Sequence, residues 1–208
     1  MVITWITHHW LEIFGAIAGI IFVFLEIRQN ILLWPVGIVT SAVYIVVFFS
    51  SKFYADMSLQ FYYLVISFYG WYTWSYGKKG GVDSSIEVTT SDSPALAVTV
   101  TPRKIVTALI VAYLLQHLII YLILEYGTDS PIAFWDSLTT SLSIVATWML
   151  AKKYIEHWLI WIFVNIVSLI LYIYKGLYPT AILFTIYAIM AVIGYREWRR
   201  HLVPLKKM

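Results

Sequence analysis

Cysteine is absent from the 208 residues, and its absence excludes three kinds of chemistry. The chain forms no disulfide framework, offers no thiolate ligand to a metal ion and has no cysteine nucleophile. Charged residues are scarce too, at 12% of the chain against about 25% in an ordinary soluble domain. So few charges cannot keep a surface of this size in water, so most of that surface must face another medium.

An excess of charge of one sign is also missing. The formal net charge is +3, which is too small to argue for nucleic acid as a partner. The first ten residues contain no Lys or Arg, and no small-residue cleavage site follows the apolar run after them. We therefore expect this run to be a retained helix and not a signal peptide.

Apolar residues dominate what is present. Hydrophobic residues make up 61% of the chain and the mean hydropathy is +0.81. A transmembrane helix needs roughly 20 mostly apolar residues. Seven stretches qualify, at residues 10–27, 31–50, 57–76, 104–125, 132–151, 156–174 and 178–196. The sequence therefore predicts an all-α polytopic membrane protein with seven transmembrane helices in a lipid bilayer.

One connection, 77–103, is long and rich in Ser, Thr and Asp. The alternation of Leu96, Val98 and Val100 within it suits a short strand or a strip lying on the membrane. A mobile linker is favoured, because strand signals this short are weak. The expected parts are a first three-helix repeat at 1–76, a cytoplasmic loop at 77–103, a linker helix at 104–125 and a second three-helix repeat with a basic tail at 126–208.

The basic residues divide unevenly between the two sides of the membrane. Only Lys52 and Lys175 fall on the side opposite the C-terminus. The other side holds Arg28, Lys78, Lys79, Arg103, Lys104, Lys152, Lys153, Arg196, Arg199, Arg200, Lys206 and Lys207. Because Lys and Arg are enriched in cytoplasmic loops, this split predicts a cytoplasmic C-terminus and an N-terminus outside.

The chain also resembles itself at an offset of 124 residues. The aligned pairs are Trp34 and Trp158, Tyr54 and Tyr178, Tyr63 and Tyr187, Gly70 and Gly194, and Trp74 and Trp198. A single linker helix between two three-helix units gives both units the same orientation. The prediction is a 3+1+3 parallel repeat, as in sugar-transporter folds, with a substrate path between its halves.

Two polar stripes are expected to face the protein interior. At about 100° per residue, one stripe on the sixth helix holds Trp158, Trp161, Asn165, Ser168 and Tyr172. Another on the fifth helix holds Asp136, Thr140, Ser143 and Thr147. An amide facing lipid at mid-span would lack partners, which favours a binding site for the first stripe. The Ser and Thr residues alone are more typical of hydrogen bonds between packed helices.

The first half supplies fewer polar candidates. The 124-residue offset aligns the sixth-helix stripe with residues that are smaller or less polar: Trp34, Gly37, Ser41, Tyr44 and Phe48. We therefore expect the first half to be close-packed and the second half to hold the ligand. Gln60 lies near Tyr63 in the third helix, and its side chain fits two roles equally well: contact with a ligand, or capping at the membrane interface. Glu26 and Arg28 end the first helix and are expected to form an interfacial ion pair.

Other classes of seven-helix protein fit less well. A retinal protein needs a Lys in the seventh helix, and the span 178–196 has none. The five His residues are scattered without metal-ligand spacing, which argues against an intramembrane enzyme and against a bound metal or cofactor. A small-ligand channel is the second interpretation and a receptor the third.

Several segments together resemble the Pnu vitamin transporters. They are Asn30-Ile31-Leu32-Leu33-Trp34-Pro35-Val36-Gly37, Phe53-Tyr54-Ala55-Asp56 with Leu59-Gln60, Gly70-Trp71-Tyr72-Thr73-Trp74, and Trp158-x-x-Trp161-x-x-x-Asn165, which looks like the family's sixth-helix motif. The resemblance spans nearly the whole chain except 77–103. It implies a seven-helix fold related to the SWEET sugar transporters, in a bacterial inner membrane, often as a homo-oligomer such as a trimer.

The resemblance also implies a function. It implies facilitated uptake of nicotinamide riboside, an NAD precursor, which a cytosolic kinase then traps by phosphorylation. Thiamine is the alternative substrate, since Tyr54-Ala55-Asp56-Met57 is similar to the thiamine branch, and riboflavin is carried less often. Both leading vitamins have an aromatic ring with a fixed positive charge, which suits stacking on Trp. The expected substrate contacts are Trp158, Trp161, Asn165, Gln60, Trp34, Asp136, Thr140 and Tyr63.

Overall fold

A computed structural model of the chain describes residues 2–50, 54–77, 96–128 and 130–203, with the side chains of 2–12 and 54–56 left aside. It contains the helices α1 (Val2–Ile27), α2 (Leu33–Ser50), α3 (Tyr54–Tyr76), α4 (Arg103–Gly127), α5 (Ala133–Ala151), α6 (His157–Tyr174) and α7 (Tyr178–Arg200). The predicted all-α fold with seven helices is confirmed. The largest differences lie in α1, which begins earlier than predicted, and in α7, which ends at Arg200.

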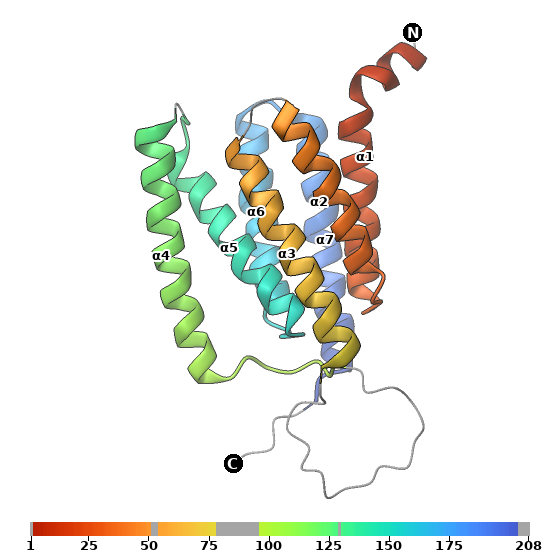
Figure 1. The fold of residues 1–208 in the computed structure, drawn as a ribbon, viewed down its shortest axis with the longest axis vertical. Coiled ribbons are helices and arrows are strands. Elements are labelled where there is room, and N and C mark those ends of the chain that lie inside the picture. The colour runs from red at the N-terminus through yellow and green to blue at the C-terminus, as the bar shows by residue number, and fades with distance from the viewer. Residues whose placement is uncertain (1, 51–53, 78–95, 129, 204–208) are drawn as a thin grey trace, which may run out of the picture.

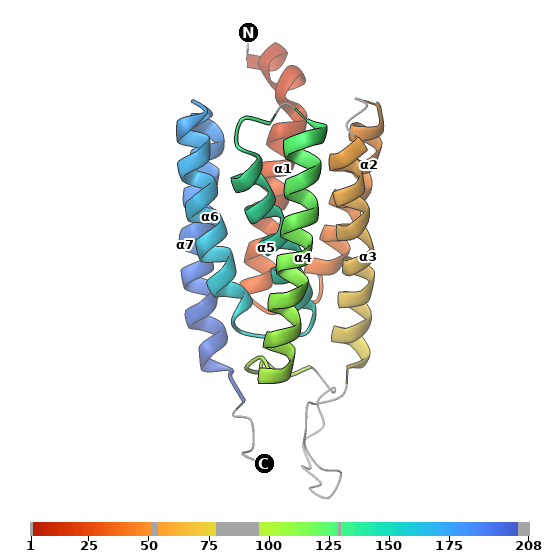
Figure 2. The ribbon, with the colours of Figure 1, turned by 90° about the vertical axis from the view of Figure 1, so that its left-hand side faces the viewer.

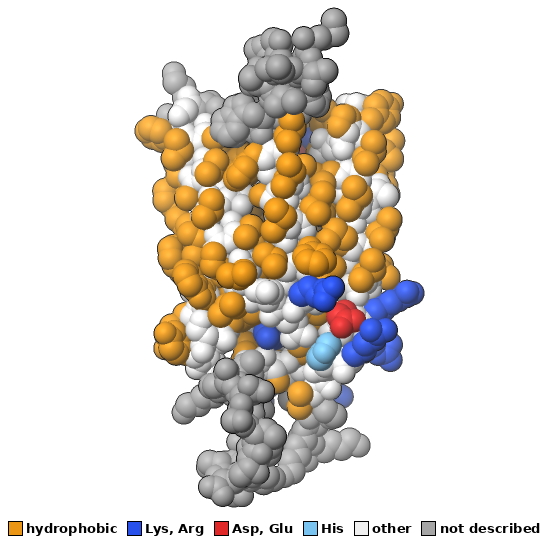
Figure 3. Space-filling view, turned by 90° about the vertical axis from the view of Figure 1, so that its right-hand side faces the viewer, with side chains coloured by type: hydrophobic (Ala, Val, Ile, Leu, Met, Phe, Trp, Pro, Cys, Tyr) orange, Lys and Arg blue, Asp and Glu red, His pale blue; other side chains and the backbone are white. Residues whose placement is uncertain are grey.

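The surface of the bundle is that of a membrane protein. Within the described residues, α2, α4, α6 and α7 are long and apolar enough to cross a membrane. Helices α3 and α5 are more polar because they bury hydroxyl groups: Ser67, Ser137 and Ser141 are all inside the bundle. Figure 3 shows hydrophobic side chains over most of one face, with Lys and Arg gathered near the end where α7 finishes.

Six helices form a closed ring. Going round it, α1 packs on α2, α2 on α3, α3 on α5, α5 on α6, α6 on α7, and α7 back on α1. Helix α4 stands outside this ring beside α5 (Figures 1 and 2). If α1, α2 and α3 are matched with α5, α6 and α7 in that order, each packed pair of helices in the ring corresponds to another packed pair.

The turns after α1 and α5 repeat the same backbone geometry. Gln29 and Lys153, which are 124 residues apart, have left-handed φ angles of 52° and 54°. Few residues other than glycine adopt this conformation. The Lys153 ammonium donates a hydrogen bond of 3.4 Å to the Gln29 side-chain oxygen. Two equivalent turns therefore meet each other at the end of the bundle where α7 finishes.

Residues 96–102 form an extended strap across that same end. Single β-bridges join Val98 to Leu202 and Thr99 to Tyr154. Val98 is 2% exposed, and its carbonyl accepts a hydrogen bond of 3.0 Å from the Val203 amide. A mobile linker is therefore wrong for these residues, because their backbone groups are paired with the ends of α5 and α7. Residues 78–95 of the predicted loop lie outside the described residues.

The strap is tied to the start of α6 by one carboxylate. Glu156 accepts the Thr101 backbone N–H at 3.1 Å and the Thr101 hydroxyl at 2.7 Å. Hydrogen bonds to a charged acceptor are about twice as strong as neutral ones. The Glu156–Thr101 contact therefore holds the strap against the bundle.

Removing the Thr101 hydroxyl tests this contact. Because Val has the same shape without the hydroxyl, Thr101→Val should lower the free energy of unfolding by about 1–2 kcal/mol. Thr107→Val is the matched control, since the exposed Thr107 hydroxyl bonds only to the Arg103 carbonyl of its own helix. Thermal unfolding in detergent compares the variants, and equal melting temperatures for the two would show that the strap is not held by Thr101.

Candidate functional site

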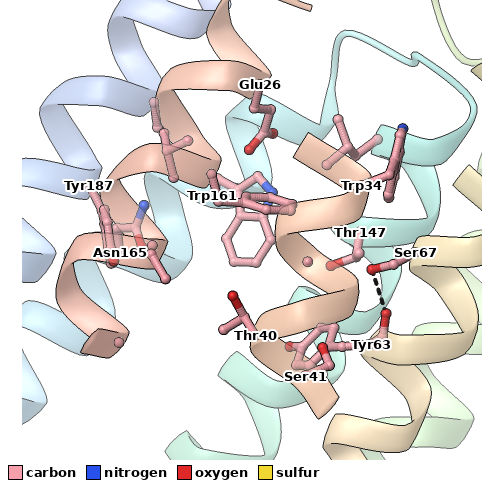
Figure 4. Close-up of a pocket in the computed structure, with 18 of the residues that line it drawn as sticks. Glu26, Trp34, Thr40, Ser41, Tyr63, Ser67, Thr147, Trp161, Asn165 and Tyr187 are labelled. Atoms are coloured by element: carbon pink, nitrogen blue, oxygen red, sulfur yellow. Dashed lines mark hydrogen bonds between the residues drawn. The ribbon is translucent and has the colours of Figure 1, made fainter. Parts of the chain in front are cut away.

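A cavity of about 310 Å³ lies inside the ring of six helices. Its volume falls at the lower end of the range of about 300–1,000 Å³ that is typical of small-molecule sites. All six ring helices contribute to its wall, and Figure 4 shows many of the side chains. The lining residues that carry polar groups or large rings are Phe22, Glu26, Trp34, Thr40, Ser41, Gln60, Tyr63, Ser67, Thr147, Trp158, Trp161, Asn165, Phe184 and Tyr187.

Three tryptophans that line the cavity carry buried polar groups. The buried indole N–H groups of Trp34, Trp158 and Trp161 have no hydrogen-bond partner among the described residues. A buried donor without a partner is destabilising by about 1–3 kcal/mol and is uncommon in folded proteins. Asn165 adds an amide that is 6% exposed. The Asn165 amide can bond hydroxyl or carbonyl oxygens of a ligand, whereas the three indole N–H groups are enclosed by the packing around them.

Charge on the wall is limited to one residue type. Among the described lining residues there is one acid, Glu26, and there is no Lys or Arg. The rest of the wall is aromatic, aliphatic, hydroxyl or amide. The cavity is therefore suited to a ligand that is aromatic, polar and either neutral or positively charged.

Six of the eight predicted site residues line this cavity: Trp34, Gln60, Tyr63, Trp158, Trp161 and Asn165. Asp136 and Thr140 are not among the described residues that line it. Asp136 instead accepts a hydrogen bond of 3.0 Å from the Ser130 hydroxyl at the start of α5. Substrate contact by any of the eight stays a prediction, and the geometry favours the six on the wall.

One expectation from the sequence is wrong. Glu26 does not form an interfacial ion pair with Arg28; it is 3% exposed and pairs with His157 at 2.9 Å, while the Arg28 guanidinium lies over the Phe24 ring. Gly15 and Gly19 line the cavity and are also tightly packed, since a Cβ at Gly15 would overlap the Tyr44 hydroxyl and one at Gly19 the Tyr187 hydroxyl. The close packing expected of the first half stays a prediction, and this half contributes to the cavity wall as well.

Sequence reasoning missed the α1 wall and Tyr187 as lining residues. A signal existed for Tyr187, because it is the repeat partner of Tyr63 and both line the cavity. No comparable signal existed for Glu26, whose repeat partner is Leu150. Its position one residue before the end of α1 is typical of a surface charge.

Four buried tryptophans seal one end of the cavity, and we call Trp34, Trp74, Trp158 and Trp198 the tryptophan closure. Their side chains are between 0% and 6% exposed. Trp34 meets Trp74 edge to face at 5.4 Å, and the repeat partners Trp158 and Trp198 meet in the same way at 5.8 Å. This closure lies at the end of the bundle where the Gln29 and Lys153 turns meet.

Lys153 supports the closure from the outside. Its ammonium lies 4.2 Å from the centre of the Trp74 ring, within cation–π range. Burial lowers the pKa of Lys153 to about 8, because the charged form loses water.

Comparison with known proteins gives one family. A family model described as "Nicotinamide mononucleotide transporter" matches residues 9–200. The nicotinamide riboside transporter PnuC of Escherichia coli K12 is 27% identical over 203 residues, which cover 91% of this chain and 84% of the relative. The riboflavin/roseoflavin transporter RibM of Streptomyces davaonensis is 23% identical, with the same coverage.

A solved structure has the same fold. The crystal structure of the vitamin B3 transporter PnuC matches with a TM-score of 0.70 at 22% identity, covering 96% of this chain and 86% of that one. This likeness supports the arrangement of the helices.

A methyl group at Gly194 tests the tryptophan closure. A Cβ added there would overlap the outer ring of Trp158, as one at Gly70 would overlap Trp34. Gly194→Ala should therefore displace Trp158 and lower the free energy of unfolding by about 1–3 kcal/mol. The control is Gly127→Ala, because a Cβ at Gly127 meets nothing within 4 Å. The two variants and wild type are compared by melting temperature and by tryptophan fluorescence. A Gly194→Ala protein with the melting temperature and fluorescence of wild type would contradict the contact between Trp158 and Gly194.

Proposed function

Since the chain belongs to the nicotinamide mononucleotide transporter family, we propose that it carries nicotinamide riboside across a bacterial inner membrane by facilitated diffusion. The protein is a multi-pass membrane transporter and not an enzyme. Relatives named as nicotinamide riboside transporters support the riboside as the substrate. Phosphorylation by a separate cytosolic kinase would trap the substrate and give the flux its direction.

The lack of basic residues on the described cavity wall is the observation that carries this proposal. A phosphate monoester holds about −1.5 to −2 charges at neutral pH. Proteins bind such groups with Arg, Lys or a cluster of backbone N–H groups. A wall with one carboxylate and no cation disfavours the nucleotide and favours the phosphate-free riboside.

The chemistry of the riboside matches the wall in two further ways. Its pyridinium ring is aromatic and carries a fixed positive charge, and an indole face such as that of Trp161 attracts such a ring by roughly 0.5–2 kcal/mol. Its ribose hydroxyls and carboxamide can bond the Asn165 amide and the hydroxyl groups of the wall.

Thiamine is the second candidate, because it also joins an aromatic ring to a fixed positive charge. The motif that favours it, Tyr54-Ala55-Asp56-Met57, lies mostly among residues whose side chains are outside the described part of the chain. Riboflavin, which the name of one relative includes, is a larger and uncharged ring system. It makes no use of the carboxylate on the wall.

The proposed orientation puts the tryptophan closure on the cytoplasmic side. The basic residues Arg28, Arg103, Lys152 and Arg199, among others, lie at that end of the described helices. The closure then separates the cavity from the cytoplasm, and substrate enters from outside. A homotrimer, which the resemblance to the Pnu transporters implies, stays a prediction.

Uptake by proteoliposomes tests the function. Wild type should take up labelled nicotinamide riboside, with little or no flux of nicotinamide mononucleotide, thiamine or riboflavin. Trp161→Ala should weaken binding of the riboside by about 1–3 kcal/mol, since one stacking platform is lost. The matched control is Trp71→Ala, because the Trp71 side chain is 42% exposed on the outside of the bundle. Faster flux of the mononucleotide or of thiamine than of the riboside would overturn the assignment.

A further inference from the structure

Glu26 is the one carboxylate among the described residues that line the cavity. It sits in the last turn of α1 and is 3% exposed. Figure 4 shows its carboxylate pointing in the direction of the Trp161 ring. A carboxylate in so dry a place is destabilising unless a partner compensates its charge.

Its partner is His157, and the hydrogen bonds determine how many protons the pair holds. The His157 Nδ1 lies 2.6 Å from the Tyr154 carbonyl oxygen, and Nε2 lies 2.9 Å from Glu26 Oε1. A carbonyl oxygen only accepts, so Nδ1 must carry a hydrogen. One further proton then lies between Nε2 and Oε1, and the pair is neutral as a whole.

The two members of the pair differ in where they lie. The His157 imidazole is fully buried, with the rings of Trp158 and Trp198 each 4.7 Å away. Glu26 lines the cavity, whereas His157 is not among the described residues that line it. The acidic member of the pair therefore faces the cavity.

Packing at this level does not require an ion pair. The residues 124 positions away from Glu26 and His157 are Leu150 and Leu33, which are 1% and 0% exposed. Leucine thus fills both of the equivalent places, one in each half of the ring. Buried ion pairs are often no more stabilising than apolar residues of similar volume. Stability alone gives no reason for the carboxylate, and its place on the cavity wall points to the ligand.

We propose that Glu26 is the counter-charge that makes this cavity select substrates with a fixed positive charge. The inference rests on the proposed function and adds a specificity-determining residue to it. A pyridinium ring in the cavity favours the form of the pair in which the shared proton lies on His157 Nε2, because the charged carboxylate then faces the ring. No proton enters or leaves the protein in this step, so the selection needs no coupled ion.

The test compares two ligands that differ in charge and hardly in shape. Nicotinamide riboside is a cation, and its 1,4-dihydro form is neutral. Binding of both to purified protein in nanodiscs is measured for wild type, Glu26→Gln and the control Glu125→Gln, which removes an exposed carboxylate on α4. Glu26→Gln should weaken binding of the cation roughly ten- to a hundredfold and leave binding of the dihydro form unchanged. The control should bind both as wild type does.

A second variant keeps the test decisive if Glu26→Gln folds poorly. The double change Glu26→Leu with His157→Leu copies the Leu150 and Leu33 arrangement and should also lose the preference for the cation. Equal weakening of both ligands, or an unchanged preference for the cation, overturns the inference. If wild type binds neither ligand, the proposed function fails instead, so the two failures are distinguishable.

Discussion

The contact of tryptophan with glycine is the constraint on which the rest of the structure depends. A ring of six helices with a cavity at its centre must be sealed at one end without filling that cavity. Trp34 against Gly70 and Trp158 against Gly194 do this, because the absence of a Cβ lets each indole lie directly on a helix backbone. The same tryptophans then form part of the cavity wall. Trp34 and Trp158 therefore take part both in closing the path and in forming the cavity wall. This suits a transporter, in which binding of the substrate must be linked to opening of the path.

The sequence was sufficient for the parts of the fold that depend on hydropathy. Seven apolar spans follow from the length of hydrocarbon that each helix must cross, whereas the start of α1 and the end of α7 lie beyond the predicted spans. The inward position of Asn165 followed from the cost of an amide in lipid. The six wall residues were found because aromatic and amide groups recur at helical spacing.

Other features could not be predicted, because they depend on contacts between distant segments. The strap at 96–102 is ordered by Glu156 and by the end of α7, which nothing in its own short alternation reveals. Glu26 was expected to be a surface charge because it lies near the end of a helix. The sequence does not show that its side chain points into the bundle. The α1 wall of the cavity could not be predicted either, because nothing in the sequence shows that Tyr44 packs on Gly15 and Tyr187 on Gly19.

The central claim is that the cavity passes a cationic, phosphate-free riboside without a coupled ion, and the charge moved per molecule tests it most directly. Current and labelled uptake can be recorded together from proteoliposomes at a clamped membrane potential. Our account predicts one positive elementary charge for each molecule of nicotinamide riboside, since the proton between Glu26 and His157 stays in the protein. No net charge, as in exchange for a proton, or more than one charge, as in cotransport with sodium, would contradict it.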